Sequence, residues 1–153
     1  NMTVRGLNSS GADAPGFDQT FSNEERLEFA KGVDYLVSIL PKTPQTDSII
    51  SKALIEQLAP NSTVINVGRG NAVDETALRQ GFDSSKLKAA VLDVFDIEPL
   101  PKDHWYWGHD RVFITSHTAA PTPSSAVVTV FARNLRLFLA EQPFDTVDAT
   151  KGY

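Results

Sequence analysis

The chain has 153 residues, 41% of them hydrophobic and 22% charged, which is typical of one globular domain and argues against a disordered, collagen-like or coiled-coil protein. Its net charge of −5, with no basic block longer than a pair, argues against nucleic acid or an anionic membrane as a partner. The sequence contains no cysteine, which excludes disulfides, zinc–thiolate sites, iron–sulfur clusters and cysteine nucleophiles. No apolar run is long enough to cross a membrane and no signal peptide is recognisable, so we expect a cytoplasmic protein.

The N-terminal part of the chain predicts two short strands and a helix. Residues 4–7 and 19–21 have the composition of short strands. Ser22 and Glu25 have the spacing of a capping box, which opens a helix. Gly32 can end that helix in a left-handed conformation.

From residue 35 onward, strands and helices alternate. Residues 35–40 are almost continuously apolar, which is typical of a parallel strand covered on both faces. The elements expected next are a helix at 51–58, a strand at 63–67, a helix from Asp74 to near Gly81 and a strand at 87–92. Their spacing is that of βαβ units.

The alternation breaks after residue 92. A loop with Pro99 and Pro101 stands where a helix is expected, and it leads to a strand at 112–115. Loops of this kind, held by a regular scaffold, often carry function. We therefore expect part of a functional site in this segment.

A long helix is predicted near the C-terminus. Thr122 is expected to cap it, Pro123 to be its first residue, and Pro143 to end it. Its apolar face comprises Val127, Val130, Phe131, Leu135 and Phe138. Together the elements predict an α/β fold, an incomplete Rossmann-like doubly wound parallel sheet with helices on both faces.

Ligands of such sheets bind at the carboxyl ends of the strands. The residues that follow successive predicted strands here are Pro41, the run Gly68-Arg69-Gly70, Asp93 and the pair Ser116-His117. Strands commonly end in polar turns, and any one of these residues alone is explained in that way. Three ionisable groups after three successive strands favour a functional site.

The side chains at these positions fit proton transfer and anion binding. Arg69 lies between two glycines, so the backbone can approach a ligand closely while the guanidinium binds a carboxylate or carbonyl oxygen. The imidazole of His117 can give or take a proton near neutral pH. Glu98, in the loop that breaks the alternation, can orient that imidazole.

Four ordered segments now carry a resemblance to a known family. They are LPKTPQT at 40–46, NVGRG at 66–70, LDVFDIEPLP at 92–101 and HTAA at 117–120. These segments resemble successive motifs of the D-isomer-specific 2-hydroxyacid dehydrogenases. The ending DATKGY at 148–153 and the His-x-Ala-Ala form are similar to the glyoxylate and hydroxypyruvate reductase branch, which includes phosphoglycerate dehydrogenase-like proteins.

The resemblance implies an oxidoreductase that reduces a small 2-oxo acid of the glyoxylate or hydroxypyruvate class to a D-2-hydroxy acid. In it, Arg69 holds the substrate carboxylate and carbonyl, His117 protonates the carbonyl oxygen, and Glu98 pairs with His117. Asp93 faces the nicotinamide carboxamide. The implied cofactor is NAD or NADP, and the residues implied to bind it are Leu40, Pro41, Val67, Gly68, Arg69, Asp93, His117 and Ala119.

The given sequence departs from the family pattern in two respects. It lacks the glycine-rich G-x-G-x-x-G fingerprint, and it lacks the N-terminal segment from which the family builds most of its substrate domain. We therefore expect residues 1–143 to form a partial dinucleotide-binding domain without the first strand and glycine-rich loop, and 144–153 to be a tail that returns to a substrate domain. Little or no activity is expected from the chain alone. The alternatives are a non-catalytic nucleotide-binding or oligomerisation remnant, and a flavodoxin-like domain with Asn8 to Gly11 as a weak phosphate loop.

The absent first strand would lie between the strands at 4–7 and 35–40. Those two strands must pair with each other or receive a partner, so we expect a homo-oligomer, most simply a two-fold dimer. The end of the 4–7 strand carries Asn8 where a carboxylate would bind the ribose 2′-hydroxyl of NAD, so NADP is expected to be tolerated or preferred.

The aromatic stretch of the same loop offers poorer candidates for chemistry. His104 and His109 lack cysteine or an acidic cluster at ligand spacing, so we expect no metal site. The Trp105, Tyr106 and Trp107 side chains are expected to pack at an interface or against a neighbouring loop.

Overall fold

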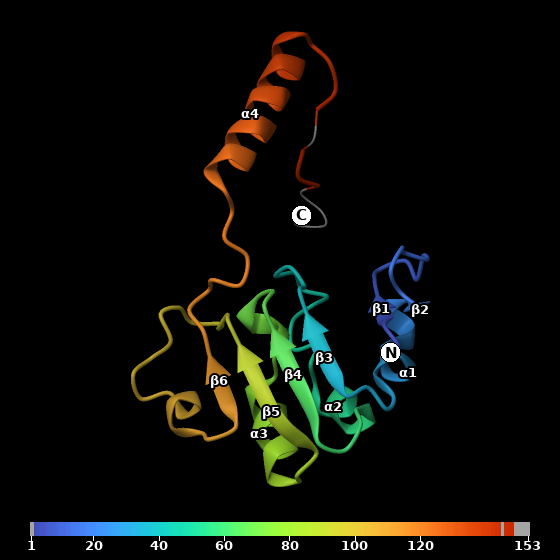
Figure 1. The fold of residues 1–153 in the computed structure, drawn as a ribbon, viewed down its shortest axis with the longest axis vertical. Coiled ribbons are helices and arrows are strands. Elements are labelled where there is room, and N and C mark those ends of the chain that lie inside the picture. The colour runs from blue at the N-terminus through green and yellow to red at the C-terminus, as the bar shows by residue number, and fades with distance from the viewer. Residues whose placement is uncertain (1, 145, 149–153) are drawn as a thin grey trace.

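A computed structural model describes residues 2–144 and 146–148 (Figure 1). Its strands are β1 (Arg5–Leu7), β2 (Gln19–Phe21), β3 (Tyr35–Ser38), β4 (Ser62–Asn66), β5 (Leu87–Leu92) and β6 (Val112–Ile114). Its α-helices are α1 (Arg26–Ala30), α2 (Lys52–Gln57), α3 (Glu75–Asp83) and α4 (Ser124–Leu139), with 3₁₀ turns at Asn23–Glu25, Gly70–Ala72 and Trp105–Gly108. Every strand and helix expected from the sequence is present within a few residues of its expected position.

The strands form two separate parallel sheets. β3, β4, β5 and β6 pair in that order, each parallel to the next, whereas β1 pairs with β2 alone. This parallel sheet with its helices confirms the Rossmann-like α/β fold class. Within the described residues β1 and β3 do not pair with each other, and Figure 1 shows the two sheets side by side.

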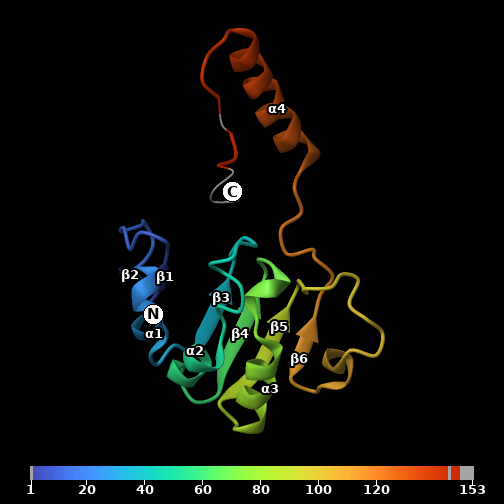
Figure 2. The ribbon, with the colours of Figure 1, turned by 180° about the vertical axis from the view of Figure 1, so that it is seen from behind.

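One face of the larger sheet holds the hydrophobic core. Both α2 and α3 lie on this face (Figure 2). The buried residues that meet there are Leu36, Val64, Ala90 and Leu92 from the strands and Leu54, Ile55, Leu78 and Phe82 from the helices. These contacts fix the strands whose carboxyl ends carry the candidate site.

The opposite face of β3 is exposed, which corrects the prediction that this strand is covered on both faces. The Tyr35 and Val37 side chains are 60% and 54% exposed, and Phe113 on β6 is 57% exposed. Successive side chains of a strand point to opposite faces, so only Leu36 and Ser38 reach the core. A continuous apolar run identified the strand but not how many of its faces are covered.

The caps predicted at Asp74 and Ser22 are present, and Ser51, which was expected to be the first residue of its helix, is the N-cap of α2. Asp74 Oδ1 accepts a hydrogen bond from the Ala77 N–H at 3.0 Å, and Ser51 accepts one from Leu54. The Ser22 N–H donates to Glu25 Oε2 at 2.9 Å, although the first turn there is 3₁₀ and α1 begins only after it. Gly32 ends this region with φ of 70°.

Removing the Asp74 cap should destabilise α3 and the fold. We expect Asp74→Ala to lower the free energy of unfolding by about 1 kcal/mol, because it leaves an N–H of the first turn without its acceptor. Urea unfolding measures this, with Asp83→Ala at the other end of the same helix as the control. Equal losses in both variants would contradict the cap.

Three predicted helix boundaries differ from the structure. Gly81 lies inside α3, where a Cβ atom would be 2.7 Å from a Leu87 methyl carbon, so it permits close packing and does not end the helix. α4 begins at Ser124, because Pro123 is extended at ψ of 132° and so occupies the cap position expected of Thr122. The same helix ends at Leu139, before Pro143.

α4 extends away from the sheet in both views (Figures 1 and 2). None of its residues is buried, and the predicted apolar face is present but exposed, with Phe131 and Phe138 at 65% and 60%. No helix among the described residues is both long and apolar enough to span a membrane. Most of the tail expected at 144–153 lies outside the described residues.

Candidate active site

The predicted site residues lie at one edge of the larger sheet. Asp93 directly follows β5, and Arg69 and His117 lie three residues beyond the ends of β4 and β6, so all three are at the carboxyl ends of parallel strands. Pro41 follows β3 at the same edge. This is the arrangement that the strand-end argument predicts.

The turn that carries Arg69 is clamped between two other loops. A Cβ atom on Gly68 would lie 2.5 Å from the Leu40 nitrogen, and one on Gly70 would lie 1.8 Å from the Phe95 carbonyl carbon. We expected these glycines to let the backbone approach a ligand. In the structure each one lets the backbone approach a neighbouring loop instead, so they fix the position of Arg69.

The Asn66 side chain holds the same turn through hydrogen bonds to its backbone. This structural role was not predicted from the sequence. The Asn66 side chain is fully buried. It donates from Nδ2 to the Arg69 carbonyl at 2.9 Å and accepts from the Gly68 N–H at 3.2 Å. A polar residue at the last position of an apolar strand was the available signal, because a buried amide needs such partners.

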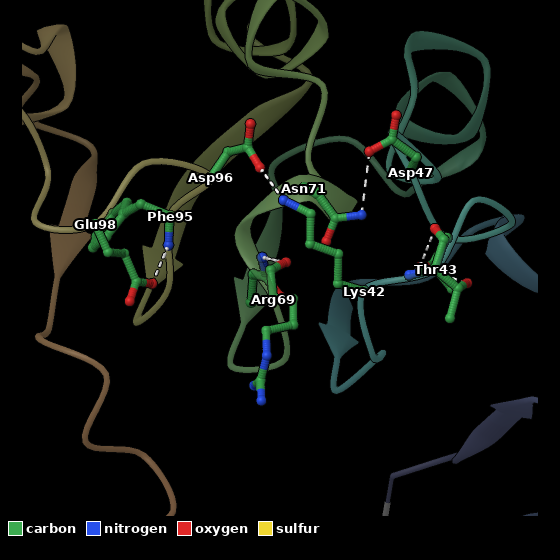
Figure 3. Close-up of polar contacts among 10 residues, drawn as sticks. Lys42, Thr43, Asp47, Arg69, Asn71, Phe95, Asp96 and Glu98 are labelled. Atoms are coloured by element: carbon green, nitrogen blue, oxygen red, sulfur yellow. Dashed lines mark hydrogen bonds and ion pairs between the residues drawn. The ribbon is translucent and has the colours of Figure 1, made fainter. Parts of the chain in front are cut away.

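The Arg69 side chain is exposed and points away from the sheet into open space (Figure 3). Its Nη1 atom donates to the Gly68 carbonyl at 2.7 Å. Much of the guanidinium fork therefore remains available to an anion. A planar carboxylate is the ligand that best matches it.

Asp93 anchors the segment that carries His117. Its carboxylate accepts hydrogen bonds from the Thr115 hydroxyl, from the Thr118 N–H at 3.0 Å and from the Ala119 N–H at 2.9 Å. The His117 N–H also donates to the Asp93 carbonyl at 2.8 Å. These bonds hold His117 in the left-handed region at φ of 56°, which is unusual for a residue with a side chain.

Burial alone would raise the pKa of Asp93, but the hydrogen bonds from Thr115, Thr118 and Ala119 outweigh burial and hold this pKa below its ordinary value. The folded pKa is therefore lower than the unfolded one. It follows that Asp93 stabilises the fold above about pH 4 and that this stabilisation is lost as the pH falls through the folded pKa.

Asp93→Asn should remove this stabilisation. One carboxylate oxygen becomes an NH₂ group that faces backbone or hydroxyl donors, so we expect about 2 kcal/mol lower stability at pH 7. The difference from wild type should shrink as the pH falls toward 3. Urea unfolding at a series of pH values tests this, and a difference that does not change with pH would contradict it.

Glu98 contacts His117, as expected. Glu98 Oε2 lies 2.9 Å from Nδ1 of His117. Glu98 Oε1 accepts from the Phe95 N–H at 2.9 Å (Figure 3). These two hydrogen bonds, the one with His117 first, lower the pKa of Glu98. Because the ionised carboxylate only accepts, the proton on this imidazole nitrogen is donated to it and Nε2 is left for a ligand.

A cavity of about 460 Å³ adjoins this pair. Its lining includes Glu98, His117, Asp93, Leu100, Trp107 and Ile114. Arg69 does not line the cavity, but its positive charge contributes to the low pKa of Glu98. A larger hollow of about 590 Å³ lies between α2 and α3 and contains none of the predicted site residues. The chemistry is thus gathered at the sheet edge, although its groups do not share one closed cleft.

Comparison with known proteins bears on what this edge does. Residues 1–119 match the family model described as D-isomer specific 2-hydroxyacid dehydrogenase, NAD binding domain. The chain belongs to this dehydrogenase family. The assignment agrees with the resemblance that the four motifs carry.

Similar proteins include curated reductases. Glyoxylate/hydroxypyruvate reductase A of Serratia proteamaculans (strain 568) is 39% identical over 153 residues, which are 99% of this chain and 49% of the relative. The protein of the same name from Klebsiella pneumoniae (strain 342) is 40% identical over 137 residues, 88% of this chain and 44% of the relative. The chain spans about half the length of the curated relatives it matches.

Solved structures of the family are also similar. A 2-hydroxyacid dehydrogenase from Xanthobacter autotrophicus Py2, in complex with NADPH and MES, aligns with a TM-score of 0.91 at 32% identity, over 98% of this chain and 62% of that one. An NADPH-dependent glyoxylate/hydroxypyruvate reductase from Sinorhizobium meliloti, in complex with NADP and sulfate, aligns at 0.90 and 31% identity, over 99% and 49%.

The remaining residues that the dehydrogenase resemblance implicates in cofactor binding lie at the same edge. Leu40, Pro41 and Val67 are half-buried at the ends of β3 and β4. Pro41 is fixed by its carbonyl, which accepts from the Thr46 hydroxyl at 2.6 Å. They offer apolar surface at the ends of β3 and β4, which suits the face of a flat ring.

Asn8 lies apart, at the end of β1 in the smaller sheet. Its Oδ1 accepts from the Gly11 N–H at 2.7 Å and its Nδ2 donates to the Ala12 carbonyl at 2.8 Å. The side chain therefore closes its own turn, and it brings no negative charge to this position of the dehydrogenase domain.

The aromatic stretch after Pro101 packs within the dehydrogenase domain. His104 Nε2 lies 3.1 Å from Glu75 Oε2, Arg79 stacks on Trp105, and Tyr106 is buried. The described residues contain no group of three side chains placed to hold a metal ion. Trp107 is 56% exposed, so the expected packing against neighbouring segments holds for Trp105 and Tyr106 but only partly for Trp107.

Proposed function

We propose that this chain is the cofactor-binding and catalytic part of a reductase that converts a 2-oxo acid of the glyoxylate or hydroxypyruvate class into a D-2-hydroxy acid. The observation that carries the proposal is the Glu98–His117 pair, 2.9 Å apart, at the same sheet edge as the exposed Arg69. Family membership and the reductases among its relatives support it.

The roles proposed for the three side chains follow from their chemistry. Arg69 binds the substrate carboxylate with its guanidinium fork. His117, with Nδ1 bound to Glu98, presents Nε2 to the carbonyl oxygen and donates the proton that this oxygen takes up on reduction. Glu98 orients the ring and stabilises its charged form. NADPH or NADH, when bound, supplies the hydride.

The residues proposed for the cofactor are those implied by the resemblance. Leu40, Pro41, Val67 and Gly68 offer apolar surface and main chain at the ends of β3 and β4. Asp93 and Ala119 follow β5 and β6 along the same edge and are hydrogen-bonded to each other. The apolar border at β3 and β4 supports the fit of a nicotinamide ring.

At the position that meets the ribose 2′-group of the cofactor, Asn8 would not repel a 2′-phosphate. We therefore propose that NADPH is accepted at least as well as NADH. The relatives crystallised with NADP or NADPH support this. In a chimera of this chain with the N-terminal half of the Serratia reductase, Asn8→Asp should raise the KM for NADPH several-fold and should leave the KM for NADH unchanged or lowered. A strong NADH preference before substitution would contradict it.

We also propose that residues 1–143 form the dinucleotide-binding unit, that 144–153 lead back toward a substrate domain, and that the chain has little or no activity alone. A homodimer is proposed because apolar surface is exposed on both the sheet and α4, including Val37, Phe113 and Phe131. The cytoplasmic location stays a prediction.

The test joins this chain to the N-terminal half of the Serratia reductase and follows oxidation of NADPH with hydroxypyruvate and glyoxylate. We expect turnover from the chimera and none from the chain alone. A folded chimera that binds NADPH but never turns over would favour a non-catalytic role. Sedimentation of the chain at micromolar concentration tests the dimer, and a stable monomer would overturn that part.

A further inference from the structure

Lys42 and Asp96 form an ion pair that joins two loops of the candidate active site. Lys42 Nζ lies 2.9 Å from Asp96 Oδ1, although the residues are 54 positions apart in sequence. Lys42 directly follows Pro41, and Asp96 lies two residues before Glu98. Figure 3 shows the Lys42 side chain reaching across to Asp96, whereas the Arg69 side chain points the opposite way.

The ion pair closes the clamp around the Arg69 turn. One side of the clamp is the Leu40 backbone against Gly68, and the other is the Phe95 and Asp96 backbone against Gly70. Lys42 therefore lies two residues from one backbone contact with the turn, and Asp96 forms part of the other. Separation of the two partners would allow both sides of the clamp to move apart.

The same loop passes any movement on to His117. The Phe95 N–H donates to Glu98 Oε1 at 2.9 Å, and Glu98 Oε2 contacts His117 Nδ1 at 2.9 Å. A shift of the backbone at Phe95 and Asp96 therefore changes the position of the Glu98 carboxylate. The interactions form one connected path from Lys42 to the imidazole.

Asp47 is the other carboxylate that acts on Lys42, but it has a partner of its own. Its Oδ1 accepts from Asn71 Nδ2 at 3.2 Å (Figure 3). The hydrogen bond and charge of Asp96, followed by the weaker effect of Asp47, raise the pKa of Lys42. Lys42 is therefore positively charged at neutral pH.

We propose that Lys42 and Asp96 are positioning residues. They hold Glu98 against His117 and keep the Arg69 turn in place between the loops that follow β3 and β5. Their importance for catalysis rests on the proposed function, but the positioning itself concerns only contacts within this chain. The pair contacts neither His117 nor Glu98 directly, so its effect travels through the loop.

The test follows the titration of His117 by NMR in the purified chain, which has only three histidines. We expect Lys42→Met and Asp96→Asn each to lower the midpoint by about 0.2–0.7 pH units, the range that an exposed ion pair can deliver, because Glu98 stabilises the imidazolium less well. The charge-swapped variant Lys42→Asp/Asp96→Lys should restore the midpoint.

The signs separate positioning from simple charge effects. Direct Coulomb interaction predicts opposite shifts, because loss of a cation raises the midpoint of a histidine and loss of an anion lowers it. Opposite shifts, or no shift in either variant, would overturn the proposal. Lys31→Met, which breaks the exposed pair with Glu28, is the matched control, and urea unfolding confirms that each variant is folded.

This readout needs no activity. Midpoints that both fall in a chain whose chimera is inactive would uphold the positioning role and reject the reductase function. An active chimera together with unshifted midpoints would uphold the reductase function and reject the positioning role of Lys42 and Asp96. The two proposals therefore fail separately.

Discussion

On the proposed reductase function, we expect His117→Ala to lower the chimera's turnover of hydroxypyruvate or glyoxylate by about 10²–10⁴-fold, the contribution that general acid catalysis typically makes. The physical reason is the geometry of the pair: Glu98 occupies Nδ1 at 2.9 Å, so Nε2 is the atom that can deliver a proton to the carbonyl oxygen. Steady-state kinetics of the chimera with the Serratia half measure the effect.

His109→Gln is the matched control for this substitution. His109 packs against Phe82 with the two rings tilted and their centroids 4.5 Å apart, and it does not line the cavity beside Glu98. It should change turnover less than about threefold, since it takes no part in the proton transfer. Near-normal turnover after His117→Ala, or equal losses in the two variants, would refute the role of His117.

Gly70→Ala gives the largest expected loss of stability. The added methyl carbon would lie 1.8 Å from the Phe95 carbonyl carbon and 2.1 Å from the Asp96 nitrogen, and a backbone contact cannot be relieved by a change of rotamer. We expect the free energy of unfolding to fall by about 3 kcal/mol or more, at the upper end of the cost of overpacking.

Gly108→Ala is the control, because nothing lies within 4 Å of the added carbon. It should change stability by less than about 0.5 kcal/mol. Urea unfolding of both variants makes the comparison. If Gly70→Ala unfolds at the wild-type urea concentration, the loop after β5 does not rest on this glycine as described.

Much of the site could be predicted from sequence because the rule behind it is local. Residues that follow parallel strands gather at one sheet edge, so Arg69, Asp93 and His117 could be grouped without knowing the fold in detail. Caps such as Asp74 are equally local, since a side chain and an N–H three residues away suffice.

What could not be predicted depends on partners distant in sequence. The sequence suggests that Gly68 and Gly70 let the backbone approach a ligand. Only the fold shows that Leu40 and Phe95 lie against these glycines instead. The ion pair between Lys42 and Asp96 could not be predicted either, because its partners are 54 positions apart in sequence. The open face of β3 escaped because an apolar run does not reveal whether a covering layer is present.

Placement of Arg69, Asp93 and His117 at the carboxyl ends of the strands leaves the opposite end of the larger sheet available for engineering. The turns there, at Asn61 before β4 and at Ser85 before β5, have φ of 60° and 58° and carry none of the proposed chemistry. Fluorescent labels or short peptide tags inserted at these turns would be separated from Arg69 and His117 by the full length of a strand. The fold thus offers attachment points that leave the cofactor edge accessible to its ligands.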